Sequence, residues 1–328
     1  MPRANSLIAR HPEVSKSQLI GQLLPPPEFA EARFENYKPD PLFASQSEAL
    51  KAAQGFIRGA KPKLFQKVSA EPGIYLDGGF GVGKTHLLAS IWHGFVGKKA
   101  YGSFLEYTSL VGYLGFQNSV EALSKFGLVC IDEFELDDPG DTMIMSRLLK
   151  ELEQRGVKFA ATSNTPPNAL GSGRFAAADF KREIQGLGSR FKIVSVDGDD
   201  YRHRDVRGES SNLSLEDLHI WGATHEESFS DEFEDVLKHL ATLHPTKYRA
   251  LVSGVSAIGI RGVRELDDQV DALRLVALID RLYEFQVPIR SSGEVPLTSV
   301  FSEAMIAGAY RKKYLRTVSR IGALTSLI

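Results

Sequence analysis

The sequence predicts an α/β fold: a three-layer sandwich around a parallel five-stranded sheet, followed by a mainly helical region. Segments with strand character alternate with helical segments between about residues 73 and 196. One of them, residues 128–132 (LVCID), is an apolar run typical of a strand buried on both faces of a parallel sheet. After about residue 200 this alternation stops and amphipathic helical patterns dominate.

Each element has its own local signal. Runs of β-forming residues predict strands over residues 73–77, 101–107, 128–132, 157–163 and 191–196. Apolar residues at helical spacing predict helices over residues 45–57, 84–95, 110–125, 142–155, 268–285 and 302–321, with a short strand over 287–295. Asp141 is the expected N-cap of the helix over 142–155, and Gly156 is expected to end it.

The length of 328 residues allows one large domain or two smaller ones. The three consecutive prolines at 25–27 cannot lie inside a helix and predict an extended connector near the N-terminus. We expect an N-terminal segment over residues 1–60, an α/β core over 61–205 and a C-terminal domain over 206–328.

The composition is that of an ordinary globular protein and limits the function classes. Apolar residues make up 43% and charged residues 24% of the chain, and the formal net charge is -2. Proteins that mainly bind nucleic acid usually carry an excess of basic residues, so the slightly negative net charge argues against nucleic acid as the partner. No apolar run has the length of a signal peptide or of a membrane span, so we expect no transmembrane segment. Cys130, the single cysteine, is expected to be a core residue.

Residues 78–85 match G-x-x-x-x-G-K-[ST] and predict a loop that holds the phosphates of a nucleotide. The motif consists of Gly78, Gly79, Phe80, Gly81, Val82, Gly83, Lys84 and Thr85. Glycines permit the backbone angles that turn successive N–H groups toward phosphate oxygens, and the following helix adds the positive end of its dipole. We expect Lys84 to bind the β- and γ-phosphates of ATP and the hydroxyl of Thr85 to bind Mg²⁺.

Two carboxylates, Asp132 and Glu133, stand at the end of the apolar strand over 128–132. Such a position faces the ligand crevice of a parallel sheet. We expect Asp132 to hold Mg²⁺, directly or through a water, and Glu133 to polarise the attacking water. Asn164 follows the next strand and is a candidate to orient that water at the γ-phosphate. The alternative is that it only begins the turn before Pro166.

These separated motifs together resemble the ZapE cell-division ATPases and their mitochondrial relatives, a branch of the AAA+ superfamily. The resemblance rests on residues 33–46, 78–85, 131–152, 161–170 (ATSN…PP), 200–204 (DYRHR), 293–297 (GEVPL) and 316–320 (RTVSR). It covers most of the chain from about residue 30. Residues 86–90 and 171–190 depart from the family's pattern.

The resemblance implies an AAA+ sandwich with a lid-like C-terminal region, ATP hydrolysis with Mg²⁺, and a role in bacterial cell division. The family's bacterial members act on the division-ring polymer FtsZ and use ATP to destabilise or remodel it. FtsZ is therefore the partner that the resemblance implies, and a cytoplasmic location at the division site follows. The mitochondrial members are linked instead to quality control of membrane proteins, which is an alternative function.

AAA+ sites are completed by an arginine of a neighbouring subunit, which stabilises charge on the transferring phosphate. Arg174, Arg182 and Arg190 all precede the predicted strand over 191–196. Arg190 is the first candidate, because it lies where a helix would meet that strand, and Arg182 is the second. Each could instead be a solvated surface side chain. An arginine that acts in trans predicts a nucleotide-dependent homo-oligomer, a hexamer.

Other functions fit parts of the pattern. A DNA-handling AAA+ ATPase such as a helicase loader shares the nucleotide motifs, but no DNA-binding module is visible. A scaffold that binds nucleotide without turnover needs neither Glu133 nor Asn164, and a P-loop kinase needs a positioned acceptor. Basic residues of the last predicted helix are candidates to meet the nucleotide or an acidic partner, or to line a solvated face: Arg311, Lys312, Lys313 and Arg320.

Overall fold

The computed structural model describes residues 5–59, 73–135, 138–165, 186, 188–199, 211–308 and 310–327. The chain divides into two compact units. One consists of Lys16–Arg204, and the other combines Met1–Ser15 with Asp205–Ile328. The segment expected over residues 1–60 is thus shared between the two units.

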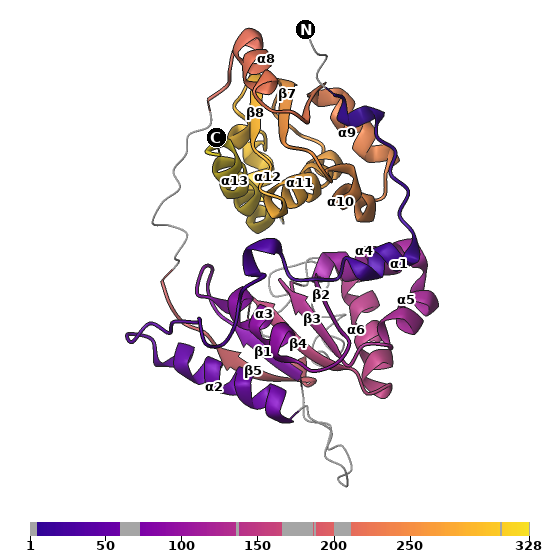
Figure 1. The fold of residues 1–328 in the computed structure, drawn as a ribbon, viewed down its shortest axis with the longest axis vertical. Coiled ribbons are helices and arrows are strands. Elements are labelled where there is room, and N and C mark those ends of the chain that lie inside the picture. The colour runs from indigo at the N-terminus through magenta and orange to yellow at the C-terminus, as the bar shows by residue number, and fades with distance from the viewer. Residues whose placement is uncertain are drawn as a thin grey trace. The chain divides into compact units, whose positions relative to one another are not determined.

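The unit Lys16–Arg204 contains a five-stranded sheet of order β2-β3-β4-β1-β5 (Figure 1). Its strands are β1 (Gly73–Asp77), β2 (Lys99–Ser103), β3 (Leu128–Asp132), β4 (Lys158–Ser163) and β5 (Phe191–Ser195). Every neighbouring pair is parallel. The predicted five-stranded α/β fold is therefore confirmed, and β4 is inserted between β1 and β3.

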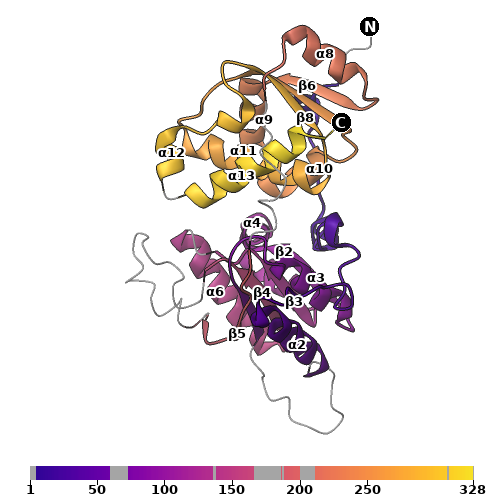
Figure 2. The ribbon, with the colours of Figure 1, turned by 90° about the vertical axis from the view of Figure 1, so that its left-hand side faces the viewer.

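Helices cover both faces of this sheet (Figure 2). On one face lie α2 (Ala44–Gly59) and α3 (Lys84–Gly94). Their buried residues form one core cluster with the strands: Ala49, Ala53, Leu87, Leu88, Ile74, Leu76, Leu128, Cys130 and Ala160. Cys130 is fully buried, and burial raises the pKa of its thiol well above the usual range, as expected of an unreactive core residue.

The other face carries α4 (Phe104–Leu114), α5 (Phe116–Leu123) and α6 (Pro139–Gln154). Aromatic rings line this side of the sheet. Tyr75 and Phe104 both make edge-to-face contacts with Phe134, whose centroid is 5.9 Å and 5.3 Å from theirs. Such contacts add to the burial of the rings and fix the segment that follows β3.

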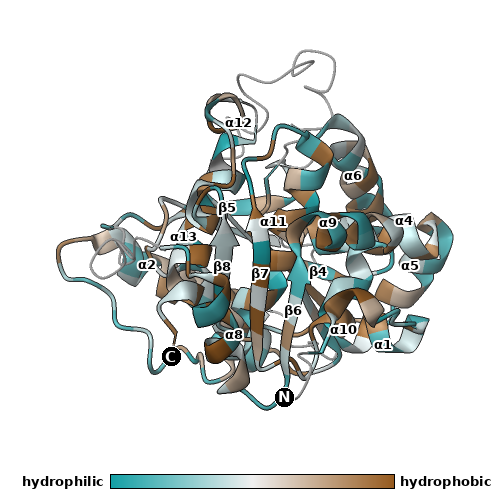
Figure 3. Cartoon of the chain, turned by 90° about the horizontal axis from the view of Figure 1, so that it is seen from above, coloured by the Kyte–Doolittle hydropathy of each residue, from teal (hydrophilic) through white to brown (hydrophobic). Residues whose placement is uncertain are grey.

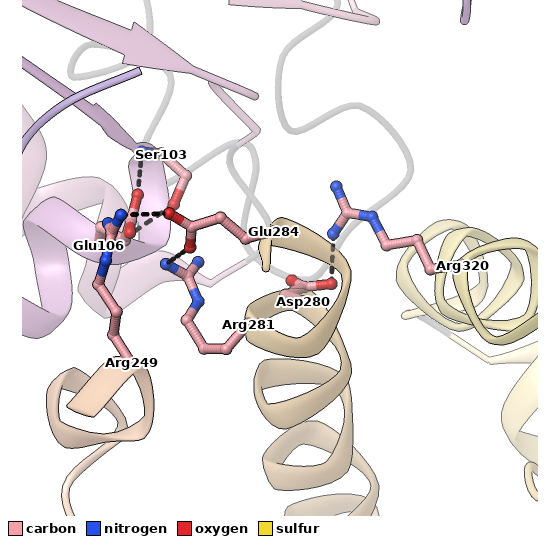
Figure 4. Close-up of polar contacts among 7 residues, drawn as sticks. All are labelled: Ser103, Glu106, Arg249, Asp280, Arg281, Glu284 and Arg320. Carbon is pink, nitrogen blue, oxygen red and sulfur yellow. Dashed lines mark hydrogen bonds and ion pairs between the residues drawn. The ribbon is translucent and has the colours of Figure 1, made fainter. Parts of the chain in front are cut away.

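Two predicted boundaries around β2 were wrong. The strand predicted over 101–107 ends at Ser103, because Ser103 and Glu106 form a capping box that begins α4 (Figure 4). The Ser103 N–H donates to Glu106 Oε2 at 2.7 Å, and the Glu106 N–H donates to Ser103 Oγ at 3.2 Å. The helix predicted over 110–125 is broken at Gly115, whose φ of 81° only glycine adopts readily.

Two other helices begin or break at a different place from that predicted. Asp138, and not Asp141, caps α6: its carboxylate accepts the Asp141 N–H at 2.9 Å. The helix predicted over 302–321 is two helices, α12 (Glu303–Ala307) and α13 (Arg311–Thr325). Gly156 follows α6 with a φ of 80°, as predicted for the residue that ends it.

The second unit is mainly helical, as predicted, but it also holds a three-stranded parallel sheet of order β6-β7-β8. The strands are β6 (Ser228–Glu232), β7 (Ala257–Val263) and β8 (Ile289–Gly293). Its helices are α8 (Leu215–Ala223), α9 (Phe233–Thr242), α10 (Tyr248–Leu251), α11 (Gln269–Glu284), α12 and α13. Figure 3 shows hydrophobic and hydrophilic residues side by side along these helices. Of these strands only β8 was predicted. The strand β6 is a polar stretch (SFSDE) without an apolar run, and the apolar stretch of β7 (AIGIRGV) was overlooked.

Residues near the N-terminus complete the second unit. Asn5 pairs with Phe229 of β6, and Leu7 is buried in the core of this unit. The Leu7 N–H donates to the Asp231 carboxylate at 2.7 Å, and the Arg10 guanidinium donates to the Leu251 carbonyl at 2.7 Å. The chain therefore passes from one unit to the other twice, after Ser15 and after Arg204.

A buried carboxylate joins α11 to α13 in the second unit. Asp280 accepts a hydrogen bond from Arg320 (Figure 4). It also lies 3.6 Å from the Arg316 guanidinium. The side chains of Asp280 and Arg316 are only 14% and 13% exposed. Burial by itself would raise the pKa of Asp280, but the charges of Arg320, Arg316 and Arg281 outweigh it and lower that pKa.

Within the described residues, no helix is both long and apolar enough to cross a bilayer.

We expect Asp280→Asn to lower the free energy of unfolding by ~3 kcal/mol at pH 7, because it removes the buried negative charge that the guanidinium groups of Arg316 and Arg320 contact. Since the pKa of Asp280 is lowered on folding, its stabilisation is complete above the ordinary value of about 4 and is lost as the pH falls through the folded pKa. The difference from wild type should therefore shrink at acidic pH. Urea unfolding can be followed by Trp221 fluorescence in a Trp92→Phe background, since the chain has two tryptophans.

Asp235→Asn is the matched control, because the Asp235–Lys238 pair is exposed, with 50% and 74% of the side chains accessible. It should change stability by less than ~1 kcal/mol. Equal losses from the two substitutions would contradict the role given to Asp280.

Candidate active site

The phosphate-binding motif forms the loop between β1 and α3. Gly81 and Gly83 adopt φ values of 68° and 91°, which side chains other than glycine rarely tolerate. Gly78 lies so close to Val196 that a Cβ would overlap the Val196 carbonyl oxygen. These glycines are therefore required by the backbone path. Phe80, at a variable position of the motif, is 38% exposed, whereas Val82 is buried.

Lys84 is the first residue of α3 and is almost completely buried, with 7% of its surface exposed. Its Nζ donates to the carbonyl oxygens of Gly78 (2.9 Å) and Gly79, and to Asn164 Oδ1 (2.9 Å). The next residue, Thr85, donates from its hydroxyl to Asp132 Oδ1 at 3.4 Å. The structure thus brings together side chains that the sequence separates by up to 80 residues.

Asp132 ends β3 and is 8% exposed. Its carboxylate accepts hydrogen bonds from the Tyr101 hydroxyl (2.8 Å), the Thr162 hydroxyl and the Glu133 N–H (3.1 Å). Burial, followed by the neighbouring charge of Glu133, raises the pKa of Asp132, and the three hydrogen bonds only partly oppose this. A cation beside the carboxylate would favour the ionised form.

Glu133 adopts a left-handed conformation with a φ of 53°, unusual for a residue other than glycine. Contacts to β4 hold it there. The Glu133 N–H donates to the Thr162 hydroxyl at 3.0 Å, and the Phe134 N–H donates to the Thr162 carbonyl at 2.7 Å. Strain of this kind persists where the surrounding structure fixes it, and it is common in active sites.

Asn164, directly after β4, is hydrogen-bonded on both sides. Its Oδ1 accepts from Lys84, and its Nδ2 donates to Glu135 Oε1 at 3.1 Å. The tip of β4 therefore reaches the phosphate-binding loop and the segment after β3 at once. The role predicted for Asn164, to orient the attacking water at the γ-phosphate, stays a prediction.

Sequence reasoning missed three residues that shape the site, namely Tyr101, Thr162 and Glu135. Tyr101 lies in β2, and its hydroxyl reaches the Asp132 carboxylate across the parallel β2–β3 pair. Thr162 could have been found, because it directly precedes the polar end of β4. Tyr101 and Glu135 gave no such signal, since a strand tyrosine and a loop glutamate are common.

The described residues contain no cluster of three or more His, Cys, Asp or Glu side chains suited to hold a metal. The Thr85 hydroxyl and the Asp132 carboxylate, joined at 3.4 Å, are nevertheless hard oxygen donors. Mg²⁺ is usually held in nucleotide sites by one or two protein oxygens together with phosphates and waters. The residues present therefore fit that ion.

Arg190 is the finger candidate that falls within the described residues, and it does not lie at this site. Arg190 precedes β5, and its carbonyl accepts the Gly73 N–H at 2.7 Å at the amino-terminal end of β1, away from the phosphate loop. Its guanidinium is ion-paired with Glu153 and is 19% exposed. Arg174 and Arg182 lie outside the described residues, as do residues 166–170 and 200–204 of the motifs quoted above. Arg320 is paired with Asp280 in the other unit.

The sheet order, the glycine loop before α3 and the carboxylates at the end of β3 define a P-loop ATPase. A profile of the AFG1-like ATPase family matches residues 13–231 and 223–327. The chain belongs to this family.

Among curated proteins, the chain is 26% identical over 329 residues to "Cell division protein ZapE" of Escherichia coli K12, covering 86% of this chain and 85% of that protein. It is 29% identical over 175 residues to "Lactation elevated protein 1 homolog B" of Danio rerio, covering 43% of this chain and 34% of that protein. The family and the ATPase class predicted from the sequence are confirmed.

Solved structures of replication initiators are also similar. AMPPCP-bound DnaA from Aquifex aeolicus shows a TM-score of 0.42 and 12% identity, covering 80% of this chain and 83% of that one. Domain III of DnaA from Thermotoga maritima shows a TM-score of 0.41 and 18% identity, covering 51% of this chain and 67% of that one.

Gly78→Ala is expected to weaken ATP binding by ~10- to 100-fold, because the added methyl group must push the loop away from the Val196 carbonyl and turn its N–H groups off the phosphates. Fluorescence anisotropy with a labelled ATP analogue measures this affinity. Gly79→Ala is the matched control, since its methyl group would meet only a Val82 methyl at 3.9 Å, and it should stay within ~3-fold of wild type. Equal losses in both variants would show that the close approach to Val196 is not the cause.

Proposed function

We propose that the chain hydrolyses ATP in an Mg²⁺-dependent reaction and uses the energy to remodel or destabilise a protein partner, the FtsZ ring of dividing bacteria. The observation that carries the hydrolysis is the meeting of Lys84, Asp132 and Asn164 at the carboxyl ends of β1, β3 and β4. Support for the division role comes from the similarity to a cell-division protein along most of both chains. The protein would then act in the cytoplasm, at the division site.

Each residue takes a role that its position allows. The Lys84 ammonium donates to three oxygens, and the phosphate oxygens of ATP would replace some of them. The backbone N–H groups of the loop after Gly78 bind the remaining phosphate oxygens. Glu133, beside Asp132, polarises the attacking water as general base, and Asn164 orients that water at the γ-phosphate.

Mg²⁺ would be held by the hydroxyl of Thr85 and the carboxylate of Asp132. When bound, the ion neutralises charge that develops on the phosphates. The Tyr101 and Thr162 hydroxyls fix the direction of the Asp132 carboxylate, so no reorientation is needed when nucleotide arrives. Burial disfavours the bare carboxylate, which makes the site receptive to a cation.

Completion of the site by a neighbouring subunit is part of the proposal. Within one chain, Arg190 lies at the amino-terminal end of the strands and so cannot serve the phosphates bound at the carboxyl ends. A head-to-tail neighbour can present this end of its sheet to the next nucleotide, and repeated contacts of that kind close into a ring. We propose Arg190 as the arginine that acts in trans and a nucleotide-dependent hexamer as the active form, with Arg182 as the second candidate.

The function is tested by sedimenting preassembled FtsZ polymers with wild-type protein, Lys84→Ala and Glu133→Gln, each with and without Mg-ATP. We expect wild-type protein to reduce or bundle the pelleted polymer only when ATP is hydrolysed. Lys84→Ala should weaken nucleotide binding and abolish turnover, because it removes the ammonium that reaches the loop carbonyls and Asn164. Glu133→Gln should still bind ATP but hydrolyse it ~100-fold or more slowly.

If the protein hydrolyses ATP but leaves the FtsZ polymers unchanged, and DNA stimulates the hydrolysis rate, a DNA-handling role would replace the division role. A wild-type hydrolysis rate in Glu133→Gln would contradict its assignment as the base.

The role of Arg190 can be tested by mixing two inactive variants. An Arg190→Ala subunit keeps an intact nucleotide site but offers no arginine to the site of its neighbour. A Glu133→Gln subunit binds ATP without hydrolysing it and still offers Arg190 to its neighbour. If Arg190 acts in trans, an equal mixture should recover about a quarter of the wild-type rate, which is the fraction expected when the two variants are random neighbours in a ring. Arg155→Ala, which removes the exposed arginine directly after α6, is the control and should remain active by itself. Failure of the mixture to recover any activity would exclude Arg190 and leave Arg182.

A further inference from the structure

Glu135 contacts the site without belonging to any of the motifs that define it. Glu135 lies in the segment after β3, and its Oε1 accepts a hydrogen bond from Asn164 Nδ2 at 3.1 Å. On the other side of the same amide, Oδ1 accepts from Lys84 Nζ at 2.9 Å. Asn164 therefore bridges a cation of the phosphate loop and an anion of the segment after β3.

The chemistry of the two neighbours fixes the orientation of this amide. The Lys84 ammonium can only donate, and the Glu135 carboxylate, when ionised, can only accept. A flipped amide would place its NH₂ group against the ammonium and its oxygen against the carboxylate, and both hydrogen bonds would be lost. Asn164 is thus held in one of its two possible orientations.

The segment that carries Glu135 is itself anchored. Phe134, one residue earlier, is fully buried, and its N–H donates to the Thr162 carbonyl at 2.7 Å. Its ring makes edge-to-face contacts with Tyr75 and Phe104. The carboxylate of Glu135 therefore projects from a backbone position that the core fixes relative to β4.

We infer that Glu135 is a positioning residue for ATP hydrolysis, acting by holding the Asn164 amide in the orientation that the reaction needs. An amide NH₂ group has two hydrogens, and Glu135 takes one of them. The other then has a defined direction in which to meet the attacking water or a γ-phosphate oxygen. This inference rests on the role proposed for Asn164.

Pre-oriented groups lower the barrier because they need not reorganise during the reaction. A free asparagine side chain samples several rotamers and both amide orientations. Loss of Glu135 should consequently slow turnover with little effect on ATP affinity, since the phosphates are held mainly by the loop and Lys84. If Glu135 only stabilised the fold, its loss would instead lower the melting temperature and leave the chemical step of the folded protein unchanged.

A double-mutant cycle on the full-length protein tests this, with single-turnover hydrolysis of Mg-ATP and ATP affinity measured for each variant. Asn164→Ala should slow the chemical step by ~100-fold, as expected for the loss of one donor to the transition state. Glu135→Ala should slow it by ~10-fold, the effect of one hydrogen bond to a charged group, with the ATP affinity within ~2-fold of wild type. Adding Glu135→Ala to Asn164→Ala should have no further effect.

Two conservative variants distinguish the length of the Glu135 side chain from its charge. Glu135→Gln keeps an oxygen at the same reach and should stay within ~3-fold of wild type, because its carbonyl can still accept from Asn164. Glu135→Asp keeps the charge but is one methylene shorter, so it should be as slow as Glu135→Ala. The melting temperature of each variant serves as the folding control, and the near-isosteric Glu135→Gln keeps the test informative if Glu135→Ala folds poorly.

The outcomes distinguish this inference from the proposed function. If Asn164→Ala hydrolyses ATP at the wild-type rate, the role of Asn164 fails and the inference falls with it. If Asn164→Ala is slow but Glu135→Ala is not, or if Glu135→Ala costs a further ~10-fold in the Asn164→Ala background, Glu135 does not act through Asn164. In both of those cases the proposed ATPase mechanism stands and only the positioning role of Glu135 is overturned.

Discussion

β4 hydrogen-bonds to β1 on one side and to β3 on the other, and all three strands run in parallel. Their carboxyl ends therefore meet at the same edge of the sheet, although the segments lie far apart in the sequence. Asn164 reaches Lys84, and Thr162 reaches both Asp132 and the Glu133 backbone, only because β4 occupies this central place. A strand order that placed β4 at the sheet edge would leave the phosphate loop without these partners.

Two buried aspartates show how the same side chain can serve function or stability. Asp132 is surrounded by hydroxyl and N–H donors and lies beside another carboxylate, so its pKa is raised and its environment is suited to an added cation. Asp280 is surrounded by guanidinium groups of its own chain, which lower its pKa. The first carboxylate is the one proposed above to accept a cation, whereas the second already contacts guanidinium groups between α11 and α13.

The second unit depends on residues from both ends of the chain. Leu7 fills its core and the Asp231 carboxylate holds the Leu7 N–H, so the N-terminus is folded together with β6. The chain passes from one unit to the other twice, after Ser15 and after Arg204.

The sequence by itself determined the parallel α/β sheet, the glycine loop and the carboxylates, because these depend on local patterns: apolar runs, glycines with special backbone angles, and acids at strand ends. It misplaced the end of β2, where Ser103 and Glu106 cap a helix in a stretch that is also hydrophobic enough for a strand. It missed two of the three strands in the sheet of the second unit; of these, β6 is polar and is placed by pairing with β7 and Asn5. Only the tertiary structure decided that Tyr101 holds Asp132 and that Glu135 holds Asn164, because such contacts join residues that sequence spacing does not relate. Hydrogen bonds of side chains across a sheet are set by strand order, which no local pattern records.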